Sequence, residues 1–268
     1  MTALDLDSAL TLLRTGEIEV QGRMVDASNA TLYGAITADG VEAHCVYKPV
    51  AGERPLWDFP DGTLAGREVS AFLVSQAGGW GVVPPTVHRD GPFGPGMVQL
   101  WIEADATVEL VDVVRRGALP RGWRAVLDAR DAGGEAVLLA HADDERLRSM
   151  AVFDAVVNNA DRKGGHILPT GSGPADPVHG VDHGICFNAD EKLRTVLWGW
   201  AGQRLREEDR EALVRVQEAL DGPLGEALAG HLTRTEVAVT GRRVRRLLRE
   251  GVMPMASESW PAIPWPAF

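Results

Sequence analysis

The chain has 268 residues, of which 45% are hydrophobic and 24% are charged, and its formal net charge is −11. This composition is typical of a globular protein with material for one large domain or two lobes. The negative charge argues against a general nucleic-acid-binding protein, and every apolar stretch is far shorter than the ~20 residues that span a membrane. The start of the chain lacks signal-peptide features, and the two cysteines give neither a disulfide framework nor a zinc pattern, so a cytoplasmic protein is expected.

Residues 1–104 predict a β-rich lobe with one inserted helix. A short leading helix is expected over residues 5–15, where leucines recur at helical spacing. Alternating apolar residues and intervening turns predict strands over residues 17–25, 32–38, 43–49, 82–88 and 97–103. The inserted helix is expected over residues 64–77 and is ended by two glycines.

From about residue 105 the pattern changes, and residues 105–268 predict a larger, mainly helical lobe. Apolar residues at helical spacing predict helices over residues 107–116, 142–159, 204–220 and 223–249. The stretch 118–141 has no clear assignment, and residues 251–268, which contain several prolines, are expected to be irregular. The expected fold class is therefore α+β with two lobes.

Residues 153–184 carry the polar groups around which the rest of the chain is interpreted. An apolar helical run leads into a polar turn with Asp161, Lys163 and His166, and Asp182 opens an Asp-x-Gly turn further on. Both carboxylates lie on turns beside short strand-like segments. This arrangement suits phosphate transfer, in which one carboxylate faces a hydroxyl group and another holds a metal ion.

The order of these residues resembles that of kinases. Protein kinases place a catalytic Asp, a Lys and a metal-binding Asn at the spacing of Asp161, Lys163 and His166, followed by Asp-Phe-Gly. The phosphatidylinositol 3- and 4-kinases use Asp-Arg-His followed by Asn, and Asp161-Arg162 looks more like that group. The chain therefore resembles an atypical kinase of the phosphatidylinositol 3-/4-kinase-like group, of the small bacterial kind, with HipA-type toxin kinases as further relatives.

The resemblance implies a two-lobed kinase-like fold that binds ATP with Mg²⁺ or Mn²⁺ in the cleft. Lys48, at the end of a predicted strand, would hold the α- and β-phosphates, and Glu68 in the inserted helix would pair with it. Asp161 would orient or deprotonate the acceptor, Lys163 would neutralise charge on the γ-phosphate, and Asp182 would hold the metal. Further nucleotide contacts would come from the first interstrand turn and from the hinge, through Ser28, Asn29, Gln99, Trp101 and Ile102.

His183 and His166 depart from the kinase pattern. His183 replaces the Phe of Asp-Phe-Gly, a residue that packs and sets conformation, so this change is tolerable. His166 replaces the metal-binding Asn, and imidazole is a poor Mg²⁺ ligand that suits softer metals better. Either His166 binds a metal such as Mn²⁺, or one metal site is altered, or activity is low. Asn158 and Asn159, just before the loop, could supply a substitute amide ligand.

Each residue also has a simpler interpretation. A lysine at a strand end is usually solvated, a glutamate on an amphipathic helix usually lies at the surface, and Asp161 or Asp182 could be turn residues. His166 could be a structural histidine, and the Ser/Asn turn could have no further role. The arginines over 242–249 are expected to form a solvated helix face, with an anionic headgroup or acidic partner as the alternative. The kinase interpretation is favoured because the whole series falls in order on a β-then-α background.

The expected function is ATP-dependent transfer of the γ-phosphate to a hydroxyl of an unidentified acceptor: a protein, a small molecule or an inositol lipid. Two alternatives stay open. One is a nucleotide-binding pseudokinase with a regulatory or scaffolding role, which His166 favours, and the other is AMP transfer on the same fold. Neither a nucleic-acid partner nor a membrane span is expected.

Overall fold

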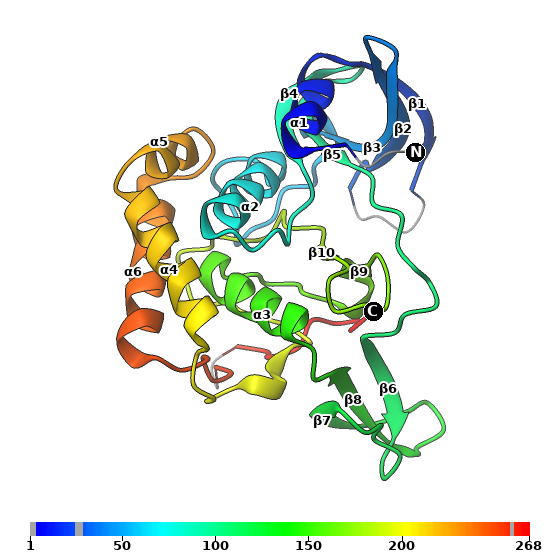
Figure 1. Ribbon diagram of the computed structural model, residues 1–268, viewed down its shortest axis with the longest axis vertical. Coiled ribbons are helices and arrows are strands. Elements are labelled where there is room, and N and C mark those ends of the chain that lie inside the picture. Colours follow the sequence, from blue (N-terminus) through cyan, green and yellow to red (C-terminus); the bar gives the residue numbers. More distant parts are fainter. Residues whose placement is uncertain (1–3, 25–28, 258–259) are drawn as a thin grey trace.

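The computed structural model describes residues 4–24, 29–257 and 260–268. A smaller β-rich part and a larger part with most of the helices lie one above the other (Figure 1). The expected α+β architecture is confirmed. The helices are α1 (Leu6–Thr15), α2 (Leu64–Gly78), α3 (Glu145–Val157), α4 (Glu207–Leu220), α5 (Pro223–Ala229) and α6 (Arg234–Glu250).

Five antiparallel strands form the sheet of the smaller part, in the order β1-β2-β3-β5-β4. They are β1 (Glu17–Arg23), β2 (Leu32–Ala38), β3 (Val41–Pro49), β4 (Thr86–Gly91) and β5 (Gly94–Leu100). Helix α1 packs against this sheet through Leu12 and Leu13, which share a buried cluster with Ile36. Because β3 lies between β2 and β5, the strand that carries Lys48 is held from both sides, with Lys48 opposite Met97.

The strands expected over 82–88 and 97–103 are shifted in the structure. The backbone N–H groups just before β4 donate to Ser75 Oγ at 3.0 and 3.2 Å, so this segment caps the end of α2 instead of joining the sheet. Residues 89–96, which lie between the two expected strands, supply residues to both β4 and β5. The connection tightens at Gly94, whose φ of +93° favours glycine.

The predicted helix over 107–116 is wrong. This stretch contains β6 (Val111–Arg115), which pairs with β8 (Ala136–Ala142), and β8 pairs in turn with β7 (Trp123–Arg130). Residues 118–141, which had no clear assignment, therefore supply most of an antiparallel sheet. The apolar residues of 107–116 fit helical and strand spacing alike, and β-branched valines favour the strand once a partner strand is present.

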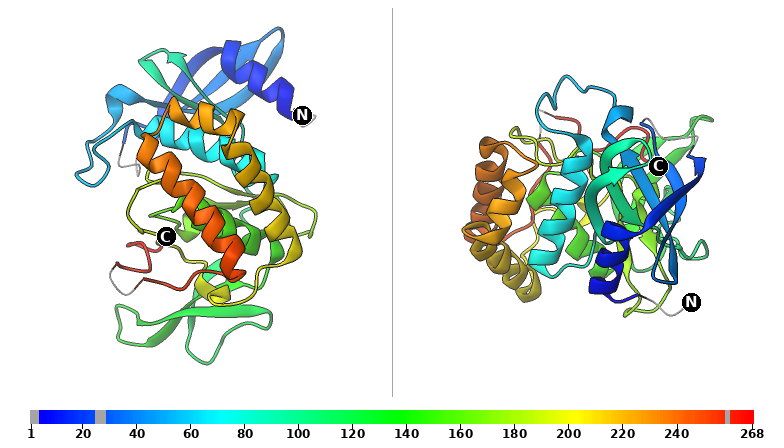
Figure 2. Two further views of the ribbon diagram at one scale, coloured as in Figure 1. Left: turned by 90° about the vertical axis from the view of Figure 1, so that its left-hand side faces the viewer. Right: turned by 90° about the horizontal axis from the view of Figure 1, so that it is seen from above.

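The helices of the larger part share one core with α2. Phe72 of α2 is buried with Leu147 and Phe153 of α3 and with Leu213 of α4, and Figure 2 shows α2 against the layer of α4 and α6. The segment 223–249, expected as one helix, is divided into α5 and α6. Because α2 packs on both parts, the lobe boundary at residue 104 stays a prediction.

A short hairpin of β9 (Ile167–Pro169) and β10 (Val178–Gly180) connects the two polar loops of the larger part. The loop with Asp161 precedes β9, and Asp182 follows β10. This pairing brings the two carboxylate loops to the same end of the hairpin. None of the described helices has both the length and the apolar character that a bilayer span requires.

Candidate functional site

Lys48 lies between two carboxylates. Its Nζ is 2.6 Å from Glu68 Oε1 and 2.8 Å from Asp182 Oδ1, which confirms the predicted Lys48–Glu68 ion pair. The Glu68 side chain is 1% exposed and that of Asp182 is 52% exposed, so the cluster opens to solvent on the Asp182 side. Burial alone would lower the pKa of the Lys48 ammonium, but the two carboxylates outweigh burial and raise this pKa, so the lysine stays charged.

Helix α2 places Glu68 under the sheet. Thr63 caps this helix, because its hydroxyl accepts a backbone N–H of the first turn, and the Glu53 carboxylate accepts two more at 2.9 and 2.8 Å. A side-chain cap typically contributes about 1 kcal/mol to helix stability. The start of α2, about one turn before Glu68, is therefore tied to the segment that follows β3.

The turn of Asp182, His183 and Gly184 packs against α2. The backbone N–H of His183 donates to Glu68 Oε2 at 2.9 Å, and Asp182 adopts a left-handed φ of +62°. A Cβ at Gly184 would lie 3.3 Å from Leu64 Cβ, so the turn approaches the helix closely. The Lys48 ammonium holds the pKa of the Asp182 carboxyl well below its usual range, and the carboxylate is ionised at neutral pH.

Asp161, Lys163 and His166 lie together on the loop after α3. Lys163 Nζ is 3.1 Å from Asp161 Oδ2, and His166 Nδ1 is 2.9 Å from the Asp161 carbonyl oxygen. Since a carbonyl only accepts, Nδ1 is assigned the proton, and Nε2 of the neutral ring faces Asp182 Oδ2 at 3.5 Å. Burial lowers the pKa of the His166 imidazole and raises that of the Asp161 carboxyl. The two loops therefore meet at the contact of His166 with Asp182.

No protein-family model matches the sequence. Protein Rv2133c of Mycobacterium tuberculosis is 50% identical to this chain over 271 residues, which cover 98% of this chain and 96% of the relative. The chain belongs to the family of Protein Rv2133c.

The structure is similar to the crystal structure of the Golgi casein kinase, with a TM-score of 0.57, 14% identity, and coverage of 91% of this chain and 74% of that chain. A lower TM-score of 0.44, at 11% identity and with 90% and 95% coverage, relates it to the Helicobacter pylori proinflammatory kinase CtkA. The likeness to the Golgi casein kinase shows that the chain has a kinase-like fold, as expected.

Arg162 ties the two loops of this kinase-like fold together, although the sequence does not single it out as a site residue. It is fully buried and makes a two-pronged ion pair with Asp154 of α3, at 2.9 and 2.8 Å. Its other donors contact His183 Nε2 at 2.7 Å and the carbonyls of His166 and Val181 at 3.3 Å. The sequence signal for this network is a carboxylate inside an apolar helical run, since a buried charge needs a partner.

The structure gives no support to the idea that Asn158 or Asn159 supplies a substitute metal ligand, because both amides are engaged elsewhere. The Asn158 amide donates to two carbonyls and accepts one backbone N–H, all within residues 188–192. The Asn159 amide donates to Asp154 Oδ1 at 3.0 Å and accepts the N–H of Asp161 at 2.9 Å. Both amides are buried and already bonded on both sides, because they shape the loops on either side of the site.

In the turn between β1 and β2, residues 25–28 lie outside the described residues, and the predicted contact of Ser28 is among them. Asn29 Oδ1 accepts the backbone N–H of Arg54 at 2.9 Å, and the N–H of Ala30 donates to the Gly52 carbonyl at 3.2 Å. The turn is thus tied to the segment that follows β3. Its predicted phosphate contact stays a prediction.

The predicted hinge residues lie at the end of β5 and just beyond it. Gln99 is buried in the sheet, where Nε2 donates to Thr86 Oγ1 at 2.8 Å, and Trp101 Nε1 donates to Glu103 Oε2 at 2.8 Å. Ile102 lies between Trp101 and Glu103 in the chain and is partly exposed. The Gln99 amide is therefore already bonded within the sheet, and the predicted adenine contacts of Gln99, Trp101 and Ile102 stay predictions.

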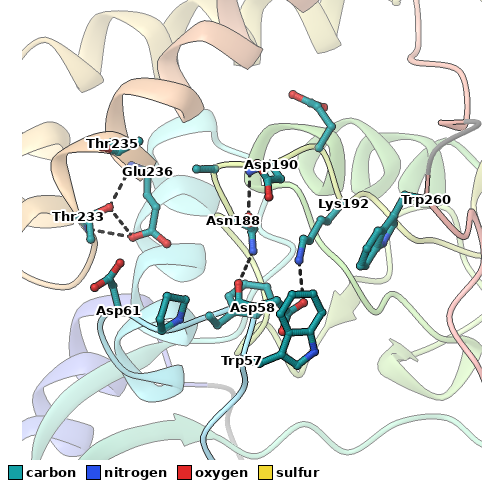
Figure 3. A pocket seen from close by; sticks show the side chains of 14 residues that line it. Trp57, Asp58, Asp61, Asn188, Asp190, Lys192, Thr233, Thr235, Glu236 and Trp260 are labelled. Carbon is teal, nitrogen blue, oxygen red and sulfur yellow. Dashed lines mark hydrogen bonds and ion pairs between the residues drawn. The ribbon is translucent and has the colours of Figure 1, made fainter.

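A separate hollow of about 710 Å³ lies beside the loop that ends at Lys192 (Figure 3). Lys192 Nζ is 2.8 Å from Asp58 Oδ2 and lies 5.1, 5.7 and 4.6 Å from the ring centres of Trp57, Phe59 and Trp260. None of the residues that line this hollow was predicted as a site residue. The Lys192 ammonium lies among the three aromatic rings, so it links the segment before α2 to Trp260 near the end of the chain.

Proposed function

We propose that the chain is an ATP-dependent phosphotransferase of the phosphatidylinositol 3-/4-kinase-like group, which acts in the cytoplasm with its nucleotide between lobes 1–104 and 105–268. The observation that carries the proposal is the position of the Lys48 ammonium between Glu68 and Asp182, on a kinase-like fold. Because Glu68 is buried and Asp182 is half-exposed, Lys48 has one fixed partner and one partner that a ligand can displace. Phosphate oxygens can take the place of Asp182 without breaking the pair with Glu68.

Asp161 would act on the acceptor. Its Oδ2 faces Lys163, which leaves Oδ1 to orient the acceptor hydroxyl and take its proton. Burial raises the pKa of the Asp161 carboxyl, which brings it closer to the range in which a carboxylate is an effective general base. The Lys163 ammonium beside it would stabilise the negative charge of the γ-phosphate.

Asp182 and His166 fit one divalent metal ion. The neutral His166 ring donates Nδ1–H to a backbone carbonyl and directs Nε2 toward the Asp182 carboxylate, an arrangement that commonly orients metal-binding histidines. A nitrogen and an oxygen donor together suit Mn²⁺ better than Mg²⁺. In the part of the chain that the structure describes, no three His, Cys, Asp or Glu side chains converge as a metal site. When bound, the ion would neutralise charge on the phosphates.

His166 also supports a second candidate, a pseudokinase that binds nucleotide without transferring phosphate. The ring nitrogen replaces the amide oxygen that kinases offer to a second metal, and both asparagines before the loop are committed to structural hydrogen bonds. On this alternative, His166→Asn restores transfer to an inactive protein.

The decisive experiment separates binding from chemistry. We expect ATP with Mg²⁺ or Mn²⁺ to raise the melting temperature of the wild-type protein, because a ligand that binds only the native state stabilises it. Asp182→Ala should lose the metal-dependent part of this shift. Asp161→Ala should keep most of the shift and lose transfer by about 10²–10⁴-fold.

Asp190→Ala is the matched control, since this carboxylate is exposed on a nearby loop and only the backbone of Asp190 supports the site. Mass spectrometry of the product distinguishes phosphate from AMP. An unmoved melting curve at saturating nucleotide with either metal contradicts nucleotide binding, and wild-type transfer by Asp161→Ala makes that residue a turn residue only.

A further inference from the structure

Residues 260–268, called the tail segment below, run along the loops that carry the proposed site. The backbone N–H of Gly164 donates to the Ala267 carbonyl at 2.8 Å. Gly164 directly follows Lys163, whose ammonium pairs with Asp161. Figure 1 shows this end of the chain, in red, next to β9. The tail segment therefore contacts the residue next to Lys163, on the same loop as Asp161, which is proposed to act on the acceptor.

The upstream half of the tail segment follows the loop after the Asp-x-Gly turn. The Ala262 carbonyl accepts the backbone N–H of Thr195 at 3.1 Å and the indole N–H of Trp198 at 2.8 Å. Trp260 covers the Lys192 ammonium, with 4.6 Å from nitrogen to ring centre (Figure 3).

The loop is shaped to receive an aromatic ring at Gly164. A Cβ at this position would lie 2.5 Å from Phe268 Cε1, whereas a Cβ at Gly165 would come no closer than 4.0 Å to the same residue. Only a glycine at position 164 leaves room for the ring where it lies. The neighbouring Gly165 lacks this constraint and gives a matched control.

The tail segment has exposed aromatic side chains in its downstream half and no side chain that could accept phosphate. Ile263 and Ala267 pack against the main hydrophobic core, but Trp265 is 90% exposed and Phe268 is 50% exposed, so the large aromatic side chains of the downstream half are only partly held. The sequence WPAIPWPAF contains no Ser, Thr or Tyr. A peptide of this chemistry can occupy an acceptor groove without being consumed.

We propose that the surface covered by the tail segment, called the seat below, is the acceptor groove. The phosphate acceptor is then an extended polypeptide that bears a hydroxyl side chain and displaces the tail segment. The backbone N–H groups of Gly164 and Thr195 both point at peptide carbonyls, and a polypeptide supplies carbonyls at regular intervals where an inositol supplies only hydroxyls. The inference rests on the proposed phosphotransfer. In the step, the acceptor oxygen bonds to the γ-phosphorus, the bridging P–O bond breaks with its electrons to ADP, and the hydroxyl proton passes to Asp161.

Binding of a free peptide tests the seat without any need for activity. A dye-labelled nonapeptide of the tail sequence is titrated into full-length proteins: wild type, Phe268→Ala, and Phe268→Ala combined with either Gly164→Ala or Gly165→Ala. Phe268→Ala weakens the tethered copy, so we expect saturable binding to this variant and to the variant with Gly165→Ala. Binding to wild type should be at least about tenfold weaker, because the tethered segment competes at a high effective concentration. Gly164→Ala should abolish binding.

Failure of the peptide to bind Phe268→Ala, or equal binding in the presence of Gly164→Ala, overturns the seat. Melting curves of all four proteins accompany the titrations, and limited proteolysis of the tail segment in the single variants Gly164→Ala and Gly165→Ala gives a second measurement. We expect faster cleavage with the first substitution only.

The acceptor assignment is then tested by placing serine singly at each position of the same peptide, with labelled ATP and the Phe268→Ala protein. We expect at least one peptide to gain phosphate, and the gain to be lost when Gly164→Ala is added. If the protein transfers phosphate to water, to an inositol lipid or to a small alcohol but to none of the peptides, the acceptor class is wrong while the phosphotransferase proposal stands. If it neither binds nor turns over ATP, the proposed function fails and the acceptor assignment fails with it.

Discussion

Breaking the buried Asp154–Arg162 pair should destabilise the loops of the site and lower the stability of the whole protein. Asp154→Asn keeps the shape of the side chain but removes the charge that lies 2.8 and 2.9 Å from two guanidinium nitrogens. Burial disfavours the Arg162 charge, yet the Asp154 carboxylate outweighs burial and raises the pKa of the guanidinium. Without the carboxylate, a fully buried cation is left without its counter-charge.

The magnitude follows from the burial of both partners. Removing one member of a buried ion pair costs about 3–5 kcal/mol, and each kcal/mol lowers the melting temperature of a protein of this size by roughly 2–4 °C. We therefore expect Asp154→Asn to melt about 6–20 °C below wild type. The nucleotide-dependent shift should also shrink, because Arg162 positions the carbonyls of His166 and Val181 on the two site loops.

Thermal and urea unfolding of three proteins give the assay. The control is Asp128→Asn, which breaks an exposed ion pair with Arg116 at 3.2 Å and should change the free energy of unfolding by no more than about 1 kcal/mol. A double variant, Asp154→Leu with Arg162→Met, should be more stable than Asp154→Asn, because apolar replacement of both charges removes the unpaired cation. If Asp154→Asn melts with the control, the buried pair does not hold the loops together.

Three further predictions follow from other groups. Glu68→Gln should weaken nucleotide binding by about 10-fold or more, since a charge-assisted hydrogen bond contributes about 1.5–3 kcal/mol. Titration calorimetry measures the affinity, with Glu211→Gln, which breaks an exposed ion pair with Arg215, as the control. Burial lowers the pKa of His183 well below its usual value, so the unfolded state binds more protons than the native state below pH ~6.5. The free energy of unfolding should therefore fall as the pH drops from 7.5 to 5.5, and an unchanged urea midpoint over this range contradicts this. Burial raises the pKa of the Cys45 thiol to about 11 and the pKa of the Cys186 thiol well above its usual value, so both should resist thiol reagents at pH 7.5 until denaturant is added. Labelling of either cysteine in the native protein would contradict this.

Features written in neighbouring residues could be predicted from the sequence. Helix α2 begins after Thr63, whose hydroxyl caps it, and ends at Gly79 with a left-handed φ of +68°; both are signals read within one turn of the chain. The order of Asp161, Lys163 and Asp182 was likewise visible, because kinase-like loops place these groups at fixed offsets. The Lys48–Glu68 pair followed from resemblance, since no local rule joins residues one helix apart in the chain.

Partner choice over long sequence distances was decided only by the tertiary structure. Within residues 107–116, Val111–Arg115 form a strand because β8 offers them a ladder of hydrogen bonds, which their own spacing could not reveal. Asn158 and Asn159 looked like spare metal ligands until the folded loops used both amides, and Arg162 looked like a motif residue until Asp154 and His183 closed around it. Local sequence limits which conformations a segment can adopt, but burial removes water as the alternative partner, so the identity of each polar contact is set by whichever group the fold brings within about 3 Å.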